Sequence, residues 1–170
     1  MITELATNQL NRKSVTGFNP VKVGFKANLC KESGIIPLTS FIAHLSVPQI
    51  SGKAFRTKYF APTFRFTMQH SLTEKISLGY NLGAEWDGDV AYPAFIYTVT
   101  TGFSLSKSLG AYIELYGFAP QDFRAEHRAD GGITFLVKNN ILLDVSGGAG
   151  LSKQAPDYYG SLGFSIRLPR

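Results

Sequence analysis

The stretch Ile76–Trp86, ISLGYNLGAEW, decides the fold. Its apolar residues occupy every second position, including Leu78, Tyr80 and Leu82, and the positions between them hold Ser, Gly, Asn and Glu. Side chains point alternately to the two faces of a β-strand, so the pattern predicts a strand with one apolar and one polar face. An amphipathic helix would repeat its apolar positions every three to four residues instead.

The same alternation recurs along the chain, and signals for the start and stop of helices are absent between the repeats. We therefore expect an all-β protein of about nine antiparallel strands, each of about ten residues. The expected strands cover residues 21–30, 38–47, 59–70, 75–86, 94–105, 109–118, 130–137, 141–151 and 158–168.

The links between these segments alternate between short and long. Three are short polar turns, at residues 71–75, 106–108 and 138–140. Tight periplasmic turns that alternate with longer external loops are typical of up-and-down transmembrane β-barrels. The longer links are expected at residues 48–58, 87–93, 119–129 and 152–157.

The composition excludes several classes of protein. The chain has 170 residues, of which 17% are charged, against about 25% in an average soluble domain. Disorder and a coiled coil are therefore not expected. Its single cysteine, Cys30, cannot form an internal disulfide, and no Cys/His cluster predicts a metal. No cofactor is implied. The net charge of +5 is scattered rather than gathered into a stripe, so nucleic acid is not an expected partner.

A soluble barrel of the lipocalin type is the competing fold, since it also alternates but turns its apolar face inward. Its polar face would meet water and carry many Lys and Glu residues, whereas this one is mostly Gly, Ser, Thr and Asn. Aromatic residues also gather near the ends of the strands, as in the girdles at membrane interfaces. The expected interface aromatics are Tyr59, Phe60, Trp86, Tyr92, Phe118, Tyr158 and Tyr159.

The polar face of the strands is where a solute would bind or pass. Its charges favour two interpretations: a network of ion pairs that fills the lumen, or a polar path whose charges tune selectivity. Parity assigns to the lumen Lys22, Lys26, His44, Arg65, Gln69, Asn81, Glu85, Glu114, Asp144 and Arg167.

An outer-membrane hydrolase is an alternative of a different class. His44 and Ser46 share one face of a strand, and Glu114 or Asp144 could orient the histidine. The sequence contains none of the motifs Gly-x-Ser-x-Gly, His-Glu-x-x-His and Gly-x-x-x-x-Gly-Lys. We therefore expect no enzymatic activity.

The N-terminal part does not follow the alternation. Residues 1–20 are expected to be a polar loop or remnant that precedes a barrel domain at 21–170. Single-chain bacterial barrels have even strand numbers, whereas the nine strands expected here are an odd number. The sequence therefore predicts the C-terminal part of a longer barrel. A weak tenth strand at residues 9–17 is the alternative.

Four segments carry a resemblance to a known family. They are Ile76–Gly88, Leu109–Phe118, Asp130–Leu151 and Ala155–Leu168. They resemble the bacterial outer-membrane proteins grouped under the MetA pathway of phenol degradation, and the resemblance extends over residues 18–168. It implies a barrel of about twelve strands that transports small solutes, aromatic ones included, and it implies no catalytic residues.

From these observations we expect a bacterial outer-membrane barrel that passes small solutes passively. A structural or adhesive barrel with a plugged lumen is the second possibility. The expected partners are membrane lipid, lipopolysaccharide, a small solute and the barrel-assembly machinery. Lipopolysaccharide phosphates would be contacted by basic residues in two outer loops, namely Lys53, Arg56, Lys58, Arg124 and Arg128.

Overall fold

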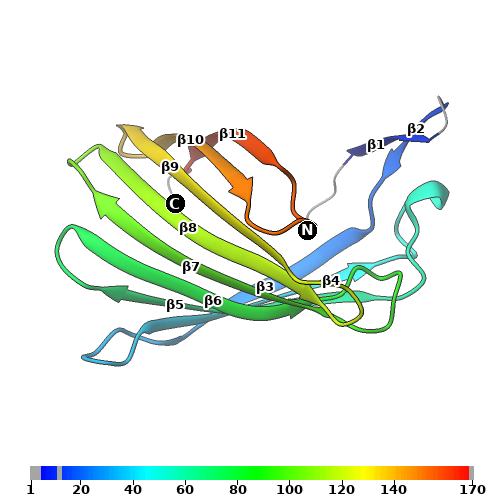
Figure 1. Cartoon of the computed structure of the whole chain (residues 1–170), viewed down its shortest axis with the longest axis horizontal. Helices are drawn as coiled ribbons and strands as arrows, with labels where there is room; N and C mark the ends of the chain where they lie inside the picture. The colour runs from blue at the N-terminus through cyan, green and yellow to red at the C-terminus, as the bar shows by residue number, and fades with distance from the viewer. Residues whose placement is uncertain (1–4, 11–12, 169–170) are drawn as a thin grey trace.

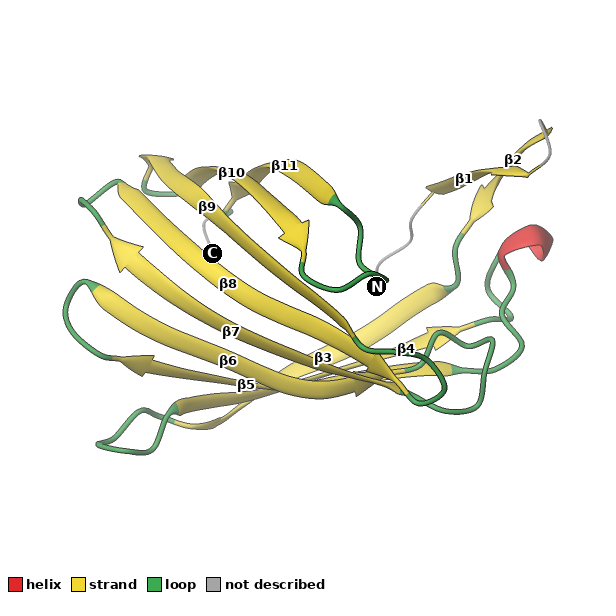
Figure 2. Cartoon of the chain, viewed as in Figure 1, coloured by secondary structure: helices red, strands yellow, loops and turns green. Residues whose placement is uncertain are grey.

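The computed structural model describes residues 5–10 and 13–168 and consists almost entirely of strands (Figures 1 and 2). Nine strands form one antiparallel sheet in which each strand pairs with the next one in the sequence. The predicted all-β, up-and-down architecture is therefore confirmed. The strands are β3 (Val21–Cys30), β4 (Leu38–Val47), β5 (Ala61–Ser71), β6 (Ile76–Glu85), β7 (Ala94–Ser104), β8 (Leu109–Pro120), β9 (Glu126–Lys138), β10 (Ile141–Gly150) and β11 (Tyr158–Ile166).

The register between strands keeps the polar positions together on one face of the sheet. Gln69 of β5 pairs with Gly79, which pairs with Thr100 of β7. The same row continues through Glu114 of β8 and Asp130 of β9. Alternation within each strand thus becomes a sheet with one polar face and one apolar face.

The sheet is curved (Figure 1), and a contact between side chains of the polar face places that face on the concave side. The hydroxyls of Tyr116 in β8 and Tyr159 in β11 lie 3.1 Å apart although β9 and β10 run between them. Three strand spacings correspond to about 14 Å of sheet. Side chains bridge such a span when the strands curve toward each other on that side.

The apolar face is convex and remains uncovered. Leu82 of β6 is 58% exposed and Leu162 of β11 is 85% exposed. Among the described residues the buried apolar side chains are few: Val21, Pro48, Ala61, Ala84 and Ile96. The protein therefore has no conventional hydrophobic core, and its largest apolar surface faces outward.

The sheet is not closed, and β3 and β11 form its two edges. One end of the sheet carries the links at residues 31–37, 72–75, 105–108 and 139–140, and the other end carries 48–60, 86–93, 121–125 and 151–157. The predicted link at 119–129 is too long, because Phe118 pairs with Glu126 and extends the β8–β9 ladder. We call this second end the loop end.

The N-terminal segment differs from the predicted loop. Strands β1 (Leu5–Leu10) and β2 (Lys13–Phe18) pair as a separate antiparallel hairpin, from Leu5 opposite Phe18 to Leu10 opposite Lys13. The loop expected at residues 1–20 is therefore wrong for these two strands, whose backbone groups satisfy each other. The hairpin does not join the large sheet as a tenth strand either.

The hairpin is anchored to the link between β4 and β5. The backbone N–H of Gly52 donates to the carbonyl of Phe18 at 3.0 Å, just before the short 3₁₀ helix η1 (Lys53–Phe55). The ring of Phe55 lies so close to Gly17 that a Cβ there would come within 2.9 Å of it. Across the described ranges, no helix combines the length and apolarity needed to cross a membrane.

Candidate functional site: the concave polar face

The concave face carries nine of the ten Lys, Arg, Asp and Glu side chains of the nine-stranded sheet. The register places these nine on this face, whereas Lys138, at the end of β9, follows a register shift and pairs with Ile141 of the convex row. Chemistry or solute contact within the sheet is therefore confined to one side. The nine residues are Lys22, Lys26, Arg65, Glu85, Glu114, Glu126, Arg128, Asp130 and Asp144.

The side chains assigned to the lumen from parity share this face. Nine of them lie in β3–β10, spread from one edge of the sheet almost to the other. The tenth, Arg167, follows the end of β11, and its backbone N–H donates to the carbonyl of Asn140 at 2.8 Å. The structure thus brings the set onto one surface but does not gather it into one cluster.

One of the ion pairs expected in the lumen is present. Nη2 of Arg65 lies 3.5 Å from Oε2 of Glu85 on the neighbouring strand, and both side chains remain partly exposed. Glu114 instead accepts a hydrogen bond from the hydroxyl of Thr100. Among the described residues Asp144 takes part in no ion pair, so the ion-pair network is only partial.

A second group of charges lies in β9, in a part of the chain that the sequence predicted to be a loop. Nη2 of Arg128 donates to Oε2 of Glu126 at 2.6 Å. The guanidinium carbon lies 5.3 Å from the ring centre of Phe118 and 5.9 Å from that of Tyr116, a cation–π arrangement. Arg128 is therefore held on the concave face, and its predicted place in a lipopolysaccharide-binding loop is wrong.

Tyr159 completes this group from β11. Its hydroxyl donates to Oδ2 of Asp130 and accepts from the hydroxyl of Tyr116. Nε of Arg128 and Oδ1 of Asp130 are buried without a hydrogen-bond partner in this structure. We call Tyr116, Glu126, Arg128, Asp130 and Tyr159 the β8–β11 network. The alternation of β8 and β11 placed Tyr116 and Tyr159 on the polar side, but the predicted loop at 119–129 hid Glu126 and Arg128, the first members of β9.

The predicted interface aromatics all lie at or near the loop end, but two of them occupy the wrong face. Phe118 and Tyr159 point to the concave side, where they contact Arg128 and Asp130. Their parity within β8 and β11 is that of the polar positions, which gives the physical reason. The five others are Tyr59, Phe60, Trp86, Tyr92 and Tyr158.

The loop-end aromatics also connect neighbouring links. Nε1 of Trp86 donates to the carbonyl of Ala91 at 3.1 Å, and its ring packs near Phe64 on the convex side. The Asp122 carboxylate, in the next link, accepts a hydrogen bond from Tyr92 and raises the pKa of that phenol. These contacts join the links after β6 and β8 at one end of the sheet.

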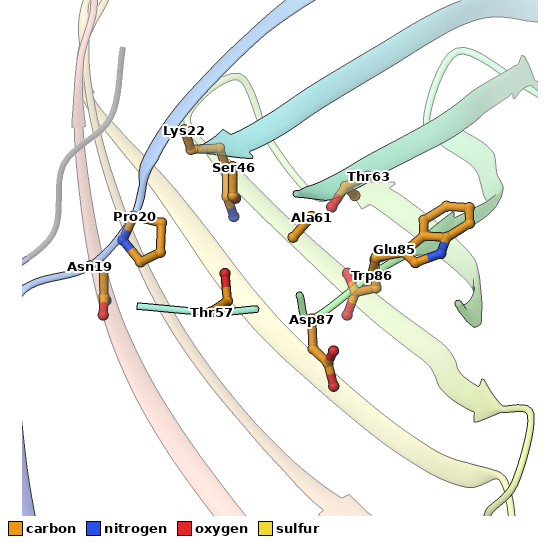
Figure 3. Close-up of a pocket in the computed structure, with 10 residues that line it drawn as sticks. All are labelled: Asn19, Pro20, Lys22, Ser46, Thr57, Ala61, Thr63, Glu85, Trp86 and Asp87. Carbon is orange, nitrogen blue, oxygen red and sulfur yellow. The ribbon is translucent and has the colours of Figure 1, made fainter. Parts of the chain in front are cut away.

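A cavity of about 330 Å³ lies at the loop end, between the starts of β3 and β5 and the ends of β4 and β6 (Figure 3). Its charged lining residues are Lys22, Glu85 and Asp87, and its other lining groups include Ser46 and Thr63. The cavity is thus a polar recess where the concave face meets the links.

The hydrolase constellation is not assembled. His44 lies in β4 between Gly24 and Thr63, whereas Glu114 lies in β8. Four strand spacings, about 19 Å of sheet, separate β4 from β8. None of the hydrogen bonds of the described residues joins His44 to Ser46, Glu114 or Asp144.

The two carboxylates after β6 serve the backbone of their own link. Oδ1 of Asp87 accepts hydrogen bonds from the backbone N–H of Asp89 at 2.7 Å and of Val90 at 3.1 Å. This is an Asx-type turn. The part of the chain that the structure describes contains no group of three or more potential metal-ligating side chains.

Comparison with known protein families agrees with the resemblance inferred from the sequence. The chain matches the family described as "Putative MetA-pathway of phenol degradation" over residues 2–168. The match extends the resemblance, which was expected for residues 18–168, to almost the whole chain. A comparison with curated proteins found no match.

Proposed function

The chain belongs to the family described under the MetA pathway of phenol degradation, and from this premise we propose that it forms an outer-membrane β-barrel. In this proposal small solutes pass passively through a lumen lined by the concave face. The convex face contacts the hydrocarbon of the membrane. The protein acts as a channel and needs no catalytic residue.

One observation supports the proposed membrane location: the sheet separates nine of its ten Lys, Arg, Asp and Glu side chains from its large apolar side chains. A lysine or arginine on the lipid face of a barrel costs about 2–4 kcal/mol at the bilayer midplane. The convex face of β3–β11 largely avoids this cost, because the only Lys, Arg, Asp or Glu residue that pairs with a convex position in the described sheet is Lys138, at the very end of β9. Convex residues such as Phe95, Ile113 and Phe164 are more than half exposed.

The competing soluble barrel would require the opposite curvature. A lipocalin-type barrel buries its apolar face inside and presents its polar face to water. Here the hydroxyls of Tyr116 and Tyr159 meet on the polar side, which is therefore the inside of the curve. The apolar side chains remain outside, where they would expose a continuous apolar surface to water if the protein were soluble.

Closure of the sheet is a requirement of this proposal. An unpaired backbone group in the hydrocarbon costs several kcal/mol, and β3 and β11 each have one unpaired edge in the described sheet. The sheet has nine antiparallel strands, an odd number, so its two edge strands run in the same direction. Because the proposal requires both insertion into the membrane and closure of the sheet, the experiment must detect both.

The test is refolding of the full chain in lipid vesicles and, separately, in plain buffer. We expect a β-rich species only with lipid, a mobility shift between unboiled and boiled samples, and efflux of a small solute from loaded vesicles. A folded, monomeric species in buffer alone would contradict the membrane location. Insertion without efflux above protein-free vesicles would contradict the channel and favour a plugged barrel.

A further inference from the structure

The unpaired positive and negative charges of the concave face lie on opposite sides of it. We propose that this separation of charge selects for dipolar solutes, so that zwitterions pass faster than neutral molecules of the same size. The proposal rests on the proposed channel function. It concerns which solutes pass, whereas the channel proposal concerns whether any do.

Four of the charged side chains on the concave face are already paired with a partner of opposite charge. Arg65 faces Glu85 at 3.5 Å, and Arg128 donates to Glu126 at 2.6 Å. These four side chains largely neutralise each other in place. Lys138 lies at the last position of β9, beside the turn at the far end of the sheet from the loop end.

The remaining charges are sorted by position in the sheet. Lys22 and Lys26 lie on β3, at one edge, and no acidic side chain lies on the concave positions of β3, β4 or β5. We call these two lysines the basic wall. Glu114, Asp130 and Asp144 lie on β8, β9 and β10, and we call them the acidic wall.

Among the described residues no cationic side chain pairs with the acidic wall, and the donors to two of its members are neutral hydroxyls. Glu114 accepts from the Thr100 hydroxyl, and Asp130 accepts from the Tyr159 hydroxyl. Glu114 and Asp130 also lie directly opposite each other in the register of β8 and β9. Like charges placed opposite each other are destabilising, so the juxtaposition of these two carboxylates does not itself stabilise the sheet.

Curvature turns the two walls toward a common space. β3 and β10 lie at opposite sides of the curved sheet, and Figure 1 shows the sheet bending between them. Positive potential at one side and negative potential at the other produce a field across the lumen. Charged groups lining a pore set its selectivity, and a transverse field orients a molecule that carries both signs.

The total charge of the face adds a second expectation. The strands carry four basic and five acidic side chains on the concave face, as identified above. A face that is nearly neutral as a whole but divided in sign should discriminate weakly between cations and anions. The same face should discriminate strongly between dipolar and neutral molecules.

The test compares two isomers in vesicles that contain the refolded full chain. β-Alanine is a zwitterion, lactamide is neutral, and the two molecules contain the same atoms. We expect severalfold faster entry of β-alanine than of lactamide, measured by osmotic swelling. We also expect a reversal potential near zero in a potassium chloride gradient.

Variants of each wall make the test specific. Neutralising the acidic wall (Glu114→Gln, Asp130→Asn, Asp144→Asn) should bring the two entry rates together and shift the reversal potential toward anion selectivity. Neutralising the basic wall (Lys22→Gln, Lys26→Gln) should also equalise the rates but shift the potential toward cation selectivity. The control Glu74→Gln, Lys75→Gln lies in the link between β5 and β6 and should change neither quantity.

The outcomes separate this inference from the proposed function. Equal entry of the two isomers through the unmodified protein would overturn the dipolar selectivity and leave the channel standing. Shifts of the reversal potential in the same direction for both wall variants would overturn it as well. Absence of entry by either isomer would overturn the channel itself, and the selectivity with it.

Discussion

The ring of Tyr159 lies over Gly148 of the neighbouring strand. The two residues are direct partners in the register of β10 and β11. A Cβ atom at Gly148 would lie 2.7 Å from Cε1 of Tyr159 and 2.6 Å from Cβ of Asp130. The missing side chain at Gly148 therefore leaves the space through which Tyr159 reaches Asp130.

Replacing this glycine should destabilise the sheet. We expect Gly148→Ala to lower the free energy of unfolding by about 1–3 kcal/mol, the usual effect of overpacking, measured by urea unfolding in detergent. The matched control is Gly160→Ala in β11, where an added Cβ has its nearest contact at 3.8 Å. Equal effects of the two substitutions would mean that the packing of Tyr159 on Gly148 is not responsible.

Loss of the hydroxyl of Tyr159 should lower the free energy of unfolding more than loss of the hydroxyl of Tyr158. Tyr159→Phe removes the hydrogen bond to Asp130 and the contact with Tyr116. A hydrogen bond to a charged group contributes about 1.5–3 kcal/mol, and we expect a loss in this range. Tyr158→Phe, at a residue that is 84% exposed, should change the free energy of unfolding little, and a comparable loss there would argue against the β8–β11 network.

The two strand ion pairs should differ in strength. Arg65 and Glu85 lie 3.5 Å apart and have side chains that are 42% and 34% exposed, so a double-mutant cycle should give a coupling below about 1 kcal/mol. The distance between Arg128 and Glu126 is shorter, at 2.6 Å. We expect a coupling energy of about 1.5 kcal/mol for this pair, the lower end of the range for hydrogen bonds to charged groups. A reversed order would show that distance and burial do not control these pairs.

Two neighbouring positions of β6 can test which face of the sheet contacts the membrane. Leu82 is convex and Asn81 is concave, as the register with Tyr97 and Thr98 shows. Leu82→Arg should reduce folding into vesicles, with a cost of up to about 2–4 kcal/mol depending on its depth in the bilayer. Asn81→Arg places the same charge on the concave face and should fold nearly as well as the unmodified chain. Equal yields of the two variants would contradict a lipid-facing convex surface.

Glu32 should confer a pH dependence on the link between β3 and β4. Hydrogen bonds from the backbone N–H and the hydroxyl of Ser71 lower the pKa of this carboxyl below its ordinary value of 4.5. A lowered pKa in the folded state means that the contact stabilises the protein above pH 4.5 and is lost as the pH falls through the folded value. The amide chemical shift of Ser71 should therefore titrate below pH 4.5.

Replacement of the carboxyl provides the control for that titration. In Glu32→Gln the Ser71 amide should show no titration in the acid range, since the side chain no longer ionises. A Ser71 amide that titrates equally in both proteins would show that a group other than Glu32 causes the effect.

The sequence by itself determined the strands and their faces. Residues 21–30 and 38–47 were predicted with the bounds that β3 and β4 have, and parity placed Lys22, Glu114 and Asp144 on one face correctly. Alternation is a local property of period two, so each strand carries its own assignment. The family resemblance was also accessible from the sequence and is confirmed.

Only the tertiary structure decided which members of the polar face meet. Tyr116 and Tyr159 are 43 residues apart in the sequence, and their contact depends on the register of three strand pairs and on the curvature of the sheet. The start of β9 at Glu126 and the separate hairpin of β1 and β2 depend likewise on pairing between segments. Such pairing is a relation between strands, and alternation within one strand carries no information about it.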